Sequence, residues 1–323
     1  MSSTKERVLR ALLSGEQGVS GGDLARQLGL SRSAVWKAIQ QLRAEGYDIQ
    51  AATNRGYYLR PGQDVFSAAE IAGRCGGGEI GRNMEFHREI DSTNIRAKVM
   101  AIAGAEHGTV VLAERQQAGH GRFGRAFYSP ENSGVYLSII LRPKLAADRA
   151  VLTTAMAAVA VARAVEAVAD VRAEIKWVND VYIVGRKVCG ILCEAGLDFE
   201  SGQMQYVVMG IGVNVAPMVF PPELASIATS ISNEWGKAVS RSAFTAALLD
   251  EINALYPQLE TGAFMEEYRE RSNVIGREIT VLRGDERYSA VAMDIDGAGS
   301  LIVQRADGVI ETLHSGEISL RFQ

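Results

Sequence analysis

Residues 119–130 read Gly-His-Gly-Arg-Phe-Gly-Arg-Ala-Phe-Tyr-Ser-Pro. The first six letters fit the Gly-x-Gly-x-x-Gly pattern of dinucleotide-binding folds, which also requires a helix directly after the loop and an acidic residue about 20 positions further on. Here the loop continues through Ser129-Pro130 towards another strand-like segment, and the acidic residue is missing. The sequence therefore excludes a dinucleotide-binding fold and leaves a glycine-rich loop that can close over an anion with Arg122 and Arg125.

Around this loop, apolar β-rich segments and longer segments of helical periodicity predict a central α/β domain with a mixed sheet. The expected strands include Thr109–Glu114, Val135–Leu141 and Tyr206–Val215, and the expected long helices are Ala150–Asp170 and Ser242–Tyr256. A chain of 323 residues exceeds the size of one ordinary core. We therefore expect an α+β protein of several domains.

The first 62 residues predict a winged helix-turn-helix domain. A helix opens at Ser3–Glu6, a second begins at Ser20 and ends at Gly29, and a third runs from about Arg32 to Glu45. Two short helices around a turn that contains glycine are typical of a DNA-binding helix-turn-helix. The alternating segment Tyr47–Leu59 then predicts a β-hairpin, the wing of such a domain.

The third of these helices is the candidate DNA-reading element. We expect its inward face to consist of Val35, Trp36, Ile39 and Leu42. The polar residues near its start suit contacts with phosphates and base edges in the major groove. The candidate DNA-binding residues are Ser31, Arg32, Ser33 and Lys37, together with Arg55 at the tip of the wing. The alternative is a small helical cap whose charges are only solvated.

The charge distribution supports DNA binding by this end of the chain. Residues 1–60 carry nine Lys and Arg against five Asp and Glu, whereas the remainder carries 25 against 33. A basic end on an acidic body is the electrostatic pattern of a domain that binds nucleic acid.

The C-terminal segment reads as short strands separated by turns. The turn signals are Gly276, Gly284-Asp285, Asp296-Gly297 and Asp307-Gly308. Their nearly regular spacing predicts a small SH3-like β-barrel. With a linker at Pro61-Gly62, the sequence predicts three domains, over residues 1–62, 63–274 and 275–323.

Composition also bears on the cellular location. The three cysteines, Cys75, Cys189 and Cys193, form no Cys-x-x-Cys motif, which favours reduced thiols in a cytoplasmic protein. Met1–Arg10 lacks the apolar segment of a secretory signal. The small-apolar run Ala155–Ala162 is far shorter than the roughly 20 residues of a membrane span. We expect no membrane association.

Several further motifs in the central segment could bind a ligand. Lys187 precedes an apolar strand and could point into a site, and Asp91–Asn94 could cap a helix or bind a polar ligand group. The glycines of Gly210–Asn214 lie inside an apolar strand, where glycine often marks a close approach of a ligand. The segment Lys176–Asp180 adds a cation, an amide and a carboxylate.

Covalent catalysis is not indicated. The sequence has no Gly-x-Ser-x-Gly nucleophile motif, and its four histidines show no metal-ligand spacing. Cys189 and Cys193 lie in an apolar run, as buried small residues do. Glycines, arginines and lysines without a nucleophile favour phosphoryl or nucleotidyl transfer, which depends on positioning and charge stabilisation.

Five motifs in this order resemble those of biotin–protein ligases. They are Asp91–Asn94, Gln116–Arg125, Lys176–Asp180, Gly185–Lys187 and Gly210–Asn214. The C-terminal segment Gly316–Arg321 matches as well, so that the resemblance covers essentially the whole chain. With its N-terminal winged helix, the chain resembles the bifunctional form of the family, the biotin operon repressor. The resemblance implies a class II synthetase-like catalytic domain.

The resemblance further implies a two-step reaction with ATP, Mg²⁺ and biotin. The biotin carboxylate attacks the α-phosphate of ATP, which gives biotinyl-5′-AMP and pyrophosphate. A lysine of a biotin carboxyl carrier protein then attacks the mixed anhydride. The implied partners are this carrier protein, operator DNA and a second copy of the chain, with biotinyl-5′-AMP as the corepressor that promotes the homodimer.

Matching the motifs residue by residue implies the following roles. The catalytic residues are Lys187 and Arg122. The biotin-binding residues are Ser92, Thr93, Asn94, Gln116, His120, Gly121, Arg122 and Lys187. The adenylate- and ATP-binding residues are Arg125, Lys176, Asn179, Asp180, Asn214 and Trp235. No protein metal site is implied, because Mg²⁺ is bound mainly through ATP, with Asp180 as the candidate protein ligand.

The chain departs from the commonest family pattern in two motifs and beside the loop. The departures are His120, Phe123, Val178 and Phe127, where arginine, arginine, proline and tryptophan are usual. The cations Arg122, Arg125 and Lys187 are retained. The resemblance therefore implies intact adenylation, but a changed hold of the loop on the adenylate.

Three alternatives remain open at this point. The chain could be a relative that handles lipoate or octanoate, since that family resembles this catalytic domain. It could be a biotin ligase whose DNA-binding domain does not regulate. A DNA-binding regulator without enzymatic activity is the third alternative, against which the retained Lys187 and Arg122 argue.

Overall fold

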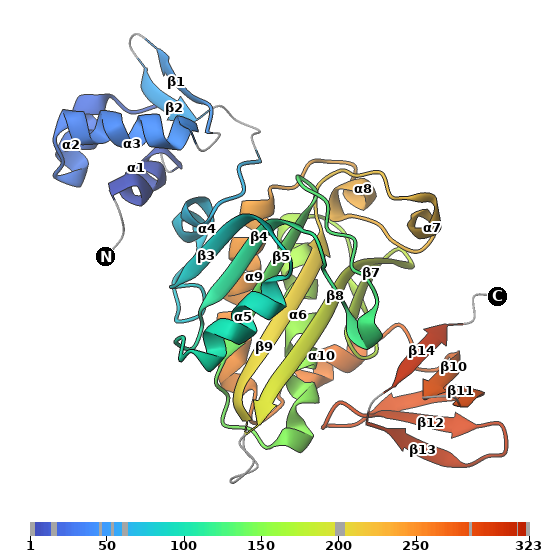
Figure 1. Ribbon diagram of the computed structural model, residues 1–323. Coiled ribbons are helices and arrows are strands. Elements are labelled where there is room, and N and C mark those ends of the chain that lie inside the picture. The colour runs from blue at the N-terminus through green and yellow to red at the C-terminus, as the bar shows by residue number, and fades with distance from the viewer. Residues whose placement is uncertain are drawn as a thin grey trace.

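The computed structural model of the protein describes residues 4–13, 18–44, 47–52, 55–59, 64–197, 204–283, 286–314 and 316–320. Over these residues the chain forms a small helical domain, a central domain around a seven-stranded sheet and a C-terminal five-stranded sheet (Figure 1). The expected α+β organisation and the mixed central sheet are confirmed. The expected linker at Pro61-Gly62 lies outside the described residues, and the division into three domains at fixed positions stays a prediction.

The N-terminal domain has the order of elements expected for a winged helix. Its elements are α1 (Thr4–Leu13), α2 (Gly21–Leu28), α3 (Arg32–Ala44), β1 (Ile49–Ala52) and β2 (Gly56–Leu59). Ser20 caps α2 through a bond from Asp23 N to its hydroxyl, and Gly29 ends the helix at φ 62°, where glycine is favoured. The antiparallel pair of β1 and β2 forms the wing.

One expectation for α3 is wrong. Its buried residues are Val35, Ala38, Ile39 and Leu42, whereas the side chain of Trp36 is 57% exposed. Successive helical residues are rotated by about 100°, so Trp36 lies on the flank of the helix, and Ala38 takes the place on the buried stripe. Trp36 lies on the same helix as most of the DNA-binding candidates, and its exposed ring is available to a partner.

Helix α4 (Ala68–Arg74) joins the first domain to the second. It packs against both α1 and α9. Ala69 belongs to the core of the N-terminal domain, and Ile71, two positions on, belongs to the main core. Ser67 caps α4, and its hydroxyl lies 2.5 Å from the phenol oxygen of Tyr47. The two domains therefore share a packed helix.

The central sheet has the strand order β3-β4-β5-β9-β8-β7-β6. Its strands are β3 (Met84–Ile90), β4 (Val110–Gln116), β5 (Gly134–Leu141), β6 (Glu174–Lys176), β7 (Asp180–Ile183), β8 (Arg186–Leu197) and β9 (Met204–Asn214). The β3–β4 pair is parallel and the other neighbours are antiparallel. The strands expected from the sequence are confirmed to within two residues.

Helices cover both faces of this sheet (Figure 1). The helices are α5 (Thr93–Ile102), α6 (Val151–Val168), α7 (Pro222–Ala225), α8 (Ile231–Trp235), α9 (Arg241–Leu255) and α10 (Met265–Glu270), with 3-10 turns at Arg122–Gly124, Ala147–Arg149 and Tyr256–Gln258. Helices α6 and α9 pack against each other over the main core, and α5 covers the opposite face. By length and composition α6 could span a membrane, but two thirds (67%) of it is buried here as the central core helix.

The C-terminal domain is an antiparallel sheet in the order β13-β12-β11-β10-β14. Its strands are β10 (Glu278–Arg283), β11 (Glu286–Ile295), β12 (Leu301–Arg305), β13 (Ile310–Leu313) and β14 (Glu317–Leu320). The small β-domain is confirmed. The expected turn at Gly284-Asp285 lies outside the described residues, and so does Arg321. Trp177 of the central domain donates its indole N–H to the Gly299 carbonyl at 2.9 Å, which fixes the two domains to each other.

Candidate active site

A cavity of about 480 Å³ lies on the central sheet beside the glycine-rich loop and the C-terminal strand β14. The structure brings into its lining all the expected biotin- and adenylate-site residues except Trp235. These are Ser92, Thr93, Asn94, Gln116, His120, Gly121, Arg122, Arg125, Lys176, Asn179, Asp180, Lys187 and Asn214. Trp235 is partly buried at the end of α8 and lies outside the lining that the described residues form.

One end of the cavity is polar but uncharged, and it is built at the start of α5. Ser92 occupies the N-cap position, yet its side chain makes no capping bond to the described start of the helix. Thr93 donates from both its backbone N and its hydroxyl to Gln116 Oε1, at 2.9 and 3.0 Å. Thr93 and Gln116 are therefore held together at the cavity wall, and Ser92 lines it beside them, where all three can bond a polar ligand group.

Buried polar residues that sequence reasoning missed support this end. Ser138 is fully buried on β5, and its hydroxyl donates to Thr93 Oγ1 at 2.8 Å and to Asn94 Oδ1 at 2.6 Å. The Asn94 amide donates to Glu194 Oε2 at 3.0 Å. A Cβ at position 210 would lie 2.0 Å from Asn94 Oδ1, which explains the glycine there. A single serine in the apolar strand 134–141 was the available signal for Ser138.

The aromatic ring of Phe127 forms part of the cavity wall next to the loop. A Cβ at Gly212 would lie 2.5 Å from this ring, and one at Gly190 would lie 3.2 Å from it. The strand glycines thus mark a close approach, as expected, but the approaching group at Gly212 is Phe127. The aromatic that follows Arg125 by two positions was the signal for this residue.

The glycine-rich loop is folded as a narrow hairpin. Gly121 N donates to the Arg125 carbonyl at 2.7 Å, and Phe127 N donates to the Gly119 carbonyl at 2.8 Å. Phe123 has a φ of 57° at the turn, and its ring is 69% exposed. Phe123 nevertheless belongs to the cavity lining, and the guanidinium carbon of Arg122 lies 5.1 Å from the centre of its ring, so the exposed ring packs against this loop cation.

The middle of the cavity gathers positive charge. Lys187 Nζ lies 2.7 Å from Asp180 Oδ1, so this carboxylate oxygen is held in an ion pair. Arg122 donates from Nη1 to Asn179 Oδ1 at 3.3 Å. Lys176 lies over the ring of Tyr182, with its Nζ 5.8 Å from the ring centroid.

The pKa shifts of the cations in the middle of the cavity reflect the burial of their charge. Burial lowers the pKa of Lys176, and the Lys187 ammonium lowers it further, although Asp180 opposes the shift. Burial also lowers the pKa of Arg122, against the attraction of Asp180 and Glu317. Cations that are buried with too few anions around them are stabilised when an anionic ligand binds.

An apolar wall follows Asn214, and sequence reasoning missed it. Phe220, Leu224 and Ile227 belong to the cavity lining. Their segment is tied to Lys187, whose N donates to the Ile227 carbonyl and whose carbonyl accepts from Thr229 N, both at 2.9 Å. The backbone of Lys187 is thereby fixed between the cationic middle and the apolar end of the cavity. Scattered apolar residues among prolines gave no periodic signal.

Metal and nucleophile chemistry were also tested against the structure. Among the described residues, no group of three or more His, Cys, Asp or Glu side chains could hold a metal ion. The carboxylate of Asp180 is ion-paired with Lys187 at 2.7 Å, and it remains the candidate protein ligand for a metal that is bound mainly by other ligands. Burial raises the pKa of Cys189, and that of Cys193 to about 12, so these thiols are not activated nucleophiles.

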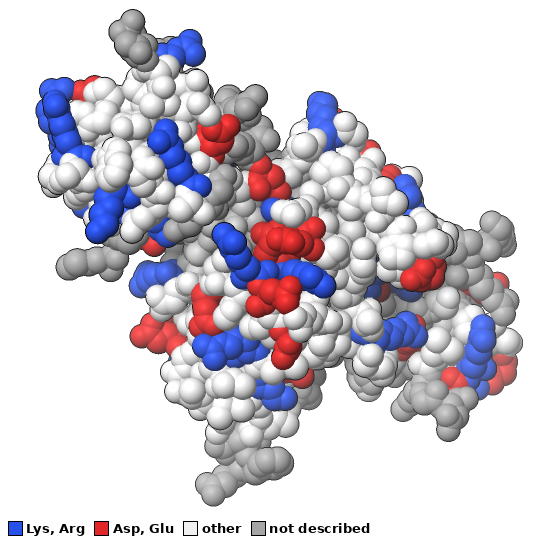
Figure 2. Space-filling view, turned by 45° about the horizontal axis from the view of Figure 1, so that its top comes forward, with Lys and Arg blue, Asp and Glu red and all other residues white. Residues whose placement is uncertain are grey.

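The DNA-binding candidates lie on one part of the N-terminal domain. The candidates Ser31, Arg32, Ser33, Lys37 and Arg55 are all exposed. Ser31 Oγ accepts from Ala34 N, so this serine also caps the start of α3. Figure 2 shows Lys and Arg side chains over the N-terminal domain with few acidic neighbours, whereas both signs alternate on the central domain.

Comparisons with known proteins agree with this arrangement. Three family models match the chain: an HTH domain over residues 4–58, the Biotin/lipoate A/B protein ligase family over 86–214 and the Biotin protein ligase C terminal domain over 274–321. Each model falls on one of the three parts seen in the structure.

The curated relatives match along the full length. The chain is 34% identical to the bifunctional ligase/repressor BirA of Bacillus subtilis, over 99% of this chain and 100% of that one. It is 31% identical to BirA of Escherichia coli, over 97% and 96% of the two chains. Among solved structures, the biotin protein ligase from Aquifex aeolicus in complex with biotin and ATP matches with a TM-score of 0.64 and 27% identity, over 75% of this chain and 100% of that one.

Proposed function

Because the chain belongs to the biotin–protein ligase family, in the form that carries a helix-turn-helix domain, we propose that it is an ATP-dependent biotin ligase and a DNA-binding repressor. The observation that carries the proposal is the division of one cavity into an uncharged polar end, a cationic middle and an apolar end. Biotin has an uncharged ureido head and a carboxylate tail, and ATP adds phosphates and a flat base. The order of these groups matches the order of the three parts.

In the first step, an oxygen of the biotin carboxylate attacks the α-phosphorus of ATP, and the bond to the bridging oxygen breaks to release pyrophosphate. We assign Ser92, Thr93, Asn94 and Gln116 to the biotin head. Lys187 and Arg122 stabilise the charge that builds up on the α-phosphate, and Lys176 and Arg125 hold the phosphates that leave. His120 and Gly121 belong to the loop that closes over the junction.

The adenosine end is assigned to the segment after β9. Asn214 donates from its amide to the Thr229 carbonyl at 3.0 Å, which braces the segment that carries the apolar wall. Phe220, Leu224 and Ile227 suit the flat face of a base. Trp235 is not assigned a direct contact, since it is not among the described residues that line the cavity.

In the second step, the amine of a carrier-protein lysine attacks the carbonyl of the mixed anhydride. AMP leaves, and the amine gives up a proton as the amide bond forms. The same cations hold the phosphate of AMP as the leaving group. Mg²⁺ bound through the phosphates would supply charge neutralisation, and Asp180, which is paired with Lys187, is the candidate protein group to hold it.

For the second activity, α3 is the DNA-reading helix, with Ser31, Arg32, Ser33 and Lys37 on its exposed side and Arg55 on the wing. A single winged helix contacts one half-site, so a palindromic operator upstream of biotin-synthesis genes requires a homodimer. Biotinyl-5′-AMP is the corepressor, because it favours the state that dimerises and is bound more tightly by that state. ATP and carrier proteins place these activities in the cytoplasm.

The adenylation assay separates the enzyme from its alternatives. We expect the purified chain with ATP and Mg²⁺ to release pyrophosphate on addition of biotin and not of lipoate. Release with lipoate alone would make the chain a lipoate-handling enzyme of the same family. No release with either would leave a ligand-sensing protein without this activity.

A second experiment tests the repressor. Sedimentation and titration with the DNA upstream of the organism's own biotin-synthesis genes, each with and without biotinyl-5′-AMP, should show a larger mass and tighter binding with the adenylate. An unchanged mass and an unchanged affinity at saturating adenylate would leave a ligase whose ligand does not control its DNA-binding domain.

A further inference from the structure

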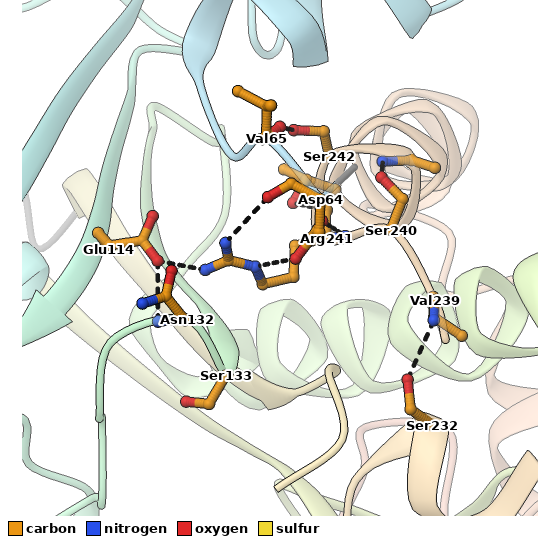
Figure 3. A network of polar contacts seen from close by, with 12 residues as sticks. Asp64, Val65, Glu114, Asn132, Ser133, Ser232, Val239, Ser240, Arg241 and Ser242 are labelled. Atoms are coloured by element: carbon orange, nitrogen blue, oxygen red, sulfur yellow. Dashed lines mark hydrogen bonds and ion pairs between the residues drawn. The ribbon is translucent and has the colours of Figure 1, made fainter. Parts of the chain in front are cut away.

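A buried ion-pair network lies where the chain enters the central domain (Figure 3). Arg241, the first residue of α9, has a side chain that is only 3% exposed. Its guanidinium group contacts the carboxylates of both Asp64 and Glu114, and its backbone N donates to Asp64 Oδ1 at 2.7 Å. Arg241, Asp64 and Glu114 are not among the described residues that line the cavity.

On one side, the network anchors the segment that comes from the DNA-binding domain. Ser242 donates from its hydroxyl to the Val65 carbonyl at 2.8 Å. The ring of Phe66 lies beneath the Arg241 guanidinium, 5.0 Å from its central carbon. Consecutive residues 64–66 are therefore each held by the start of α9. Helix α4, which is shared with the N-terminal domain, begins two residues later.

On its other side, the network holds a turn between two strands of the central sheet. Glu114 Oε1 accepts from Asn132 N at 2.9 Å, and Asn132 has a left-handed φ of 61°. Asparagine is among the residues other than glycine that adopt this conformation most readily, and a contact to its backbone helps to fix it. The bond from Asn132 to the Glu114 carboxylate is such a contact.

The same turn touches both ends of the ligand cavity. Before Asn132, Ser129 accepts a bond from the amide of Gln116 at 3.2 Å, on the side assigned to biotin. After it, the Ser133 carbonyl accepts from Val215 N and Ala216 N, the two residues that follow Asn214. A shift of Glu114 would therefore move contacts on the biotin side and on the adenylate side together.

The position of Glu114 depends on Arg241. Glu114 is 9% exposed, and a buried carboxylate that loses its cation is strongly destabilised in its charged form. Asp64 occupies another part of the same guanidinium group, so the orientation of Arg241 depends in turn on the linker side. A connected path of charged contacts thus leads from residue 64 to the turn at 129–133.

We propose that Arg241 is a positioning residue for the ligand site, through which Asp64 and the segment from the DNA-binding domain stabilise the turn at 129–133. The inference rests on the proposed function, because it assigns biotin and its adenylate to this cavity. Coupling of this kind is reciprocal. If bound DNA holds the linker in one state and thereby strengthens ligand binding by some factor, bound ligand favours that state of the linker by the same factor.

The test uses the full-length chain with Asp64→Asn, Arg241→Gln and Arg241→Lys. Asp64→Asn leaves the Arg241–Glu114 pair in place and alters only the linker side. We expect it to raise the KM for biotin and to speed the loss of biotinyl-5′-AMP by about fivefold, with kcat changed by less than about twofold. Arg241→Gln should change both quantities by about tenfold, and Arg241→Lys by less.

The matched control is Arg163→Met. Arg163 also pairs with two carboxylates from other elements, Glu267 at 2.5 Å and Glu251 at 3.3 Å, but it lies on α6, away from the linker and the cavity lining. We expect this variant to lower the melting temperature without changing the KM for biotin or the adenylate lifetime. The control separates loss of an ion pair from loss of positioning.

The outcomes are distinct. A folded Asp64→Asn variant with the wild-type KM and adenylate lifetime would overturn the inference, even if Arg241→Gln fails to fold. A control that shifts the KM as much as Asp64→Asn would overturn it too, because general destabilisation would then suffice. A wild-type chain that forms no adenylate would overturn the proposed function itself, and with it this inference.

Discussion

Arg125 Nη1 lies 2.6 Å from Glu317 Oε1, so the glycine-rich loop of the central domain is paired with strand β14 of the C-terminal domain. Both residues belong to the cavity lining. Arg125 is 67% exposed, and an exposed pair of this kind contributes at most about 1 kcal/mol. Its importance lies in its position in the cavity lining, where it favours the arrangement of the loop seen in this structure.

We therefore expect Glu317→Gln to shorten the lifetime of bound biotinyl-5′-AMP by about threefold, which corresponds to a weak ion pair. High salt should have the same effect on the wild type and little further effect on the variant. Stopped-flow or filter-based dissociation of labelled adenylate measures both. Glu311→Gln is the control, because Glu311 pairs with Arg305 inside the C-terminal domain. Equal lifetimes of Glu317→Gln and wild type would remove the pair from the account.

Lys187→Ala should slow adenylate formation by roughly a hundredfold and leave the fold intact. Its ammonium group stabilises charge on the α-phosphate in the transition state, and loss of one such group costs about 3 kcal/mol, or roughly a hundredfold in rate. Pyrophosphate release with ATP, Mg²⁺ and biotin is the measurement, with the exposed Lys144→Ala as control. A folded variant that releases pyrophosphate at nearly the wild-type rate would take Lys187 out of the mechanism.

Arg122→Gly is expected to release the intermediate prematurely. Arg122 is bonded to Asn179 across the cavity, and its loss leaves the hairpin without this tie. Free biotinyl-5′-AMP then reacts with lysines of unrelated proteins, so off-target labelling of added albumin should rise by about tenfold as one charge-assisted contact is lost. Labelling of albumin and of a carrier domain is compared on one blot. Retention of the adenylate for as long as in the wild type would show that Arg122 is not the clamp.

The buried charge of Lys176 predicts a pH dependence. Because burial lowers the pKa of Lys176, its charge destabilises the unliganded fold at neutral pH, and this penalty declines as the pH rises through the lowered pKa. Lys176→Met should thus stabilise the unliganded protein while raising the KM for ATP by about tenfold.

The same shift acts on the wild-type enzyme in the opposite direction. Lys176 loses its charge at a pH below the usual range for lysine, so the KM for ATP should rise on the alkaline side. Lys176→Arg should move this rise to higher pH, because arginine keeps its charge. Thermal melts and ATP titrations across pH test both effects. Identical alkaline profiles for wild type and Lys176→Arg would contradict the assignment.

The local patterns of the sequence predict the fold well. Ser20 and Gly29 bound α2 because a side-chain cap and a left-handed glycine are local devices. Trp36 is the informative failure. An aromatic residue on an amphipathic helix favours burial by its type, but its place on the helix is fixed by rotation, and Ala38 fits the narrow contact with the other helices instead.

The sequence predicts the site residues that belong to a recognisable motif. It misses the residues that only long-range packing brings to the site. Lys187 and Gln116 belong to recognisable segments. Ser138 and Phe220 come from a strand and an irregular segment that match no motif, and only the tertiary fold brings them to the cavity or its supports. Glu317 lies in the matching segment Gly316–Arg321, but its place in the cavity lining depends on the tertiary fold as well. Arg241 is hidden in the same way, since nothing in its neighbourhood along the chain announces partners at positions 64 and 114.

The exposed Trp36 gives a prediction for DNA binding. It lies on α3 next to Lys37, so an apolar ring is presented on the reading helix, where contact with thymine methyl groups is a mode of base recognition. Trp36→Ala should weaken binding to the biotin-gene upstream DNA by about tenfold and leave adenylation unchanged. Fluorescence titrations with that DNA and with a scrambled duplex measure the effect. Unchanged affinity for the specific duplex would place Trp36 outside the interface.

The most direct test of the central claim is transfer to an acceptor lysine. The purified chain is incubated with ATP, Mg²⁺ and a biotin carrier domain, with either biotin or lipoate, and the intact mass of the carrier is measured. We expect the mass to increase by one biotinyl group, on the carrier's acceptor lysine, with biotin alone, and to do so roughly a hundredfold more slowly with Lys187→Ala. A carrier that gains a lipoyl group, or gains nothing from an enzyme that is folded, would contradict the account.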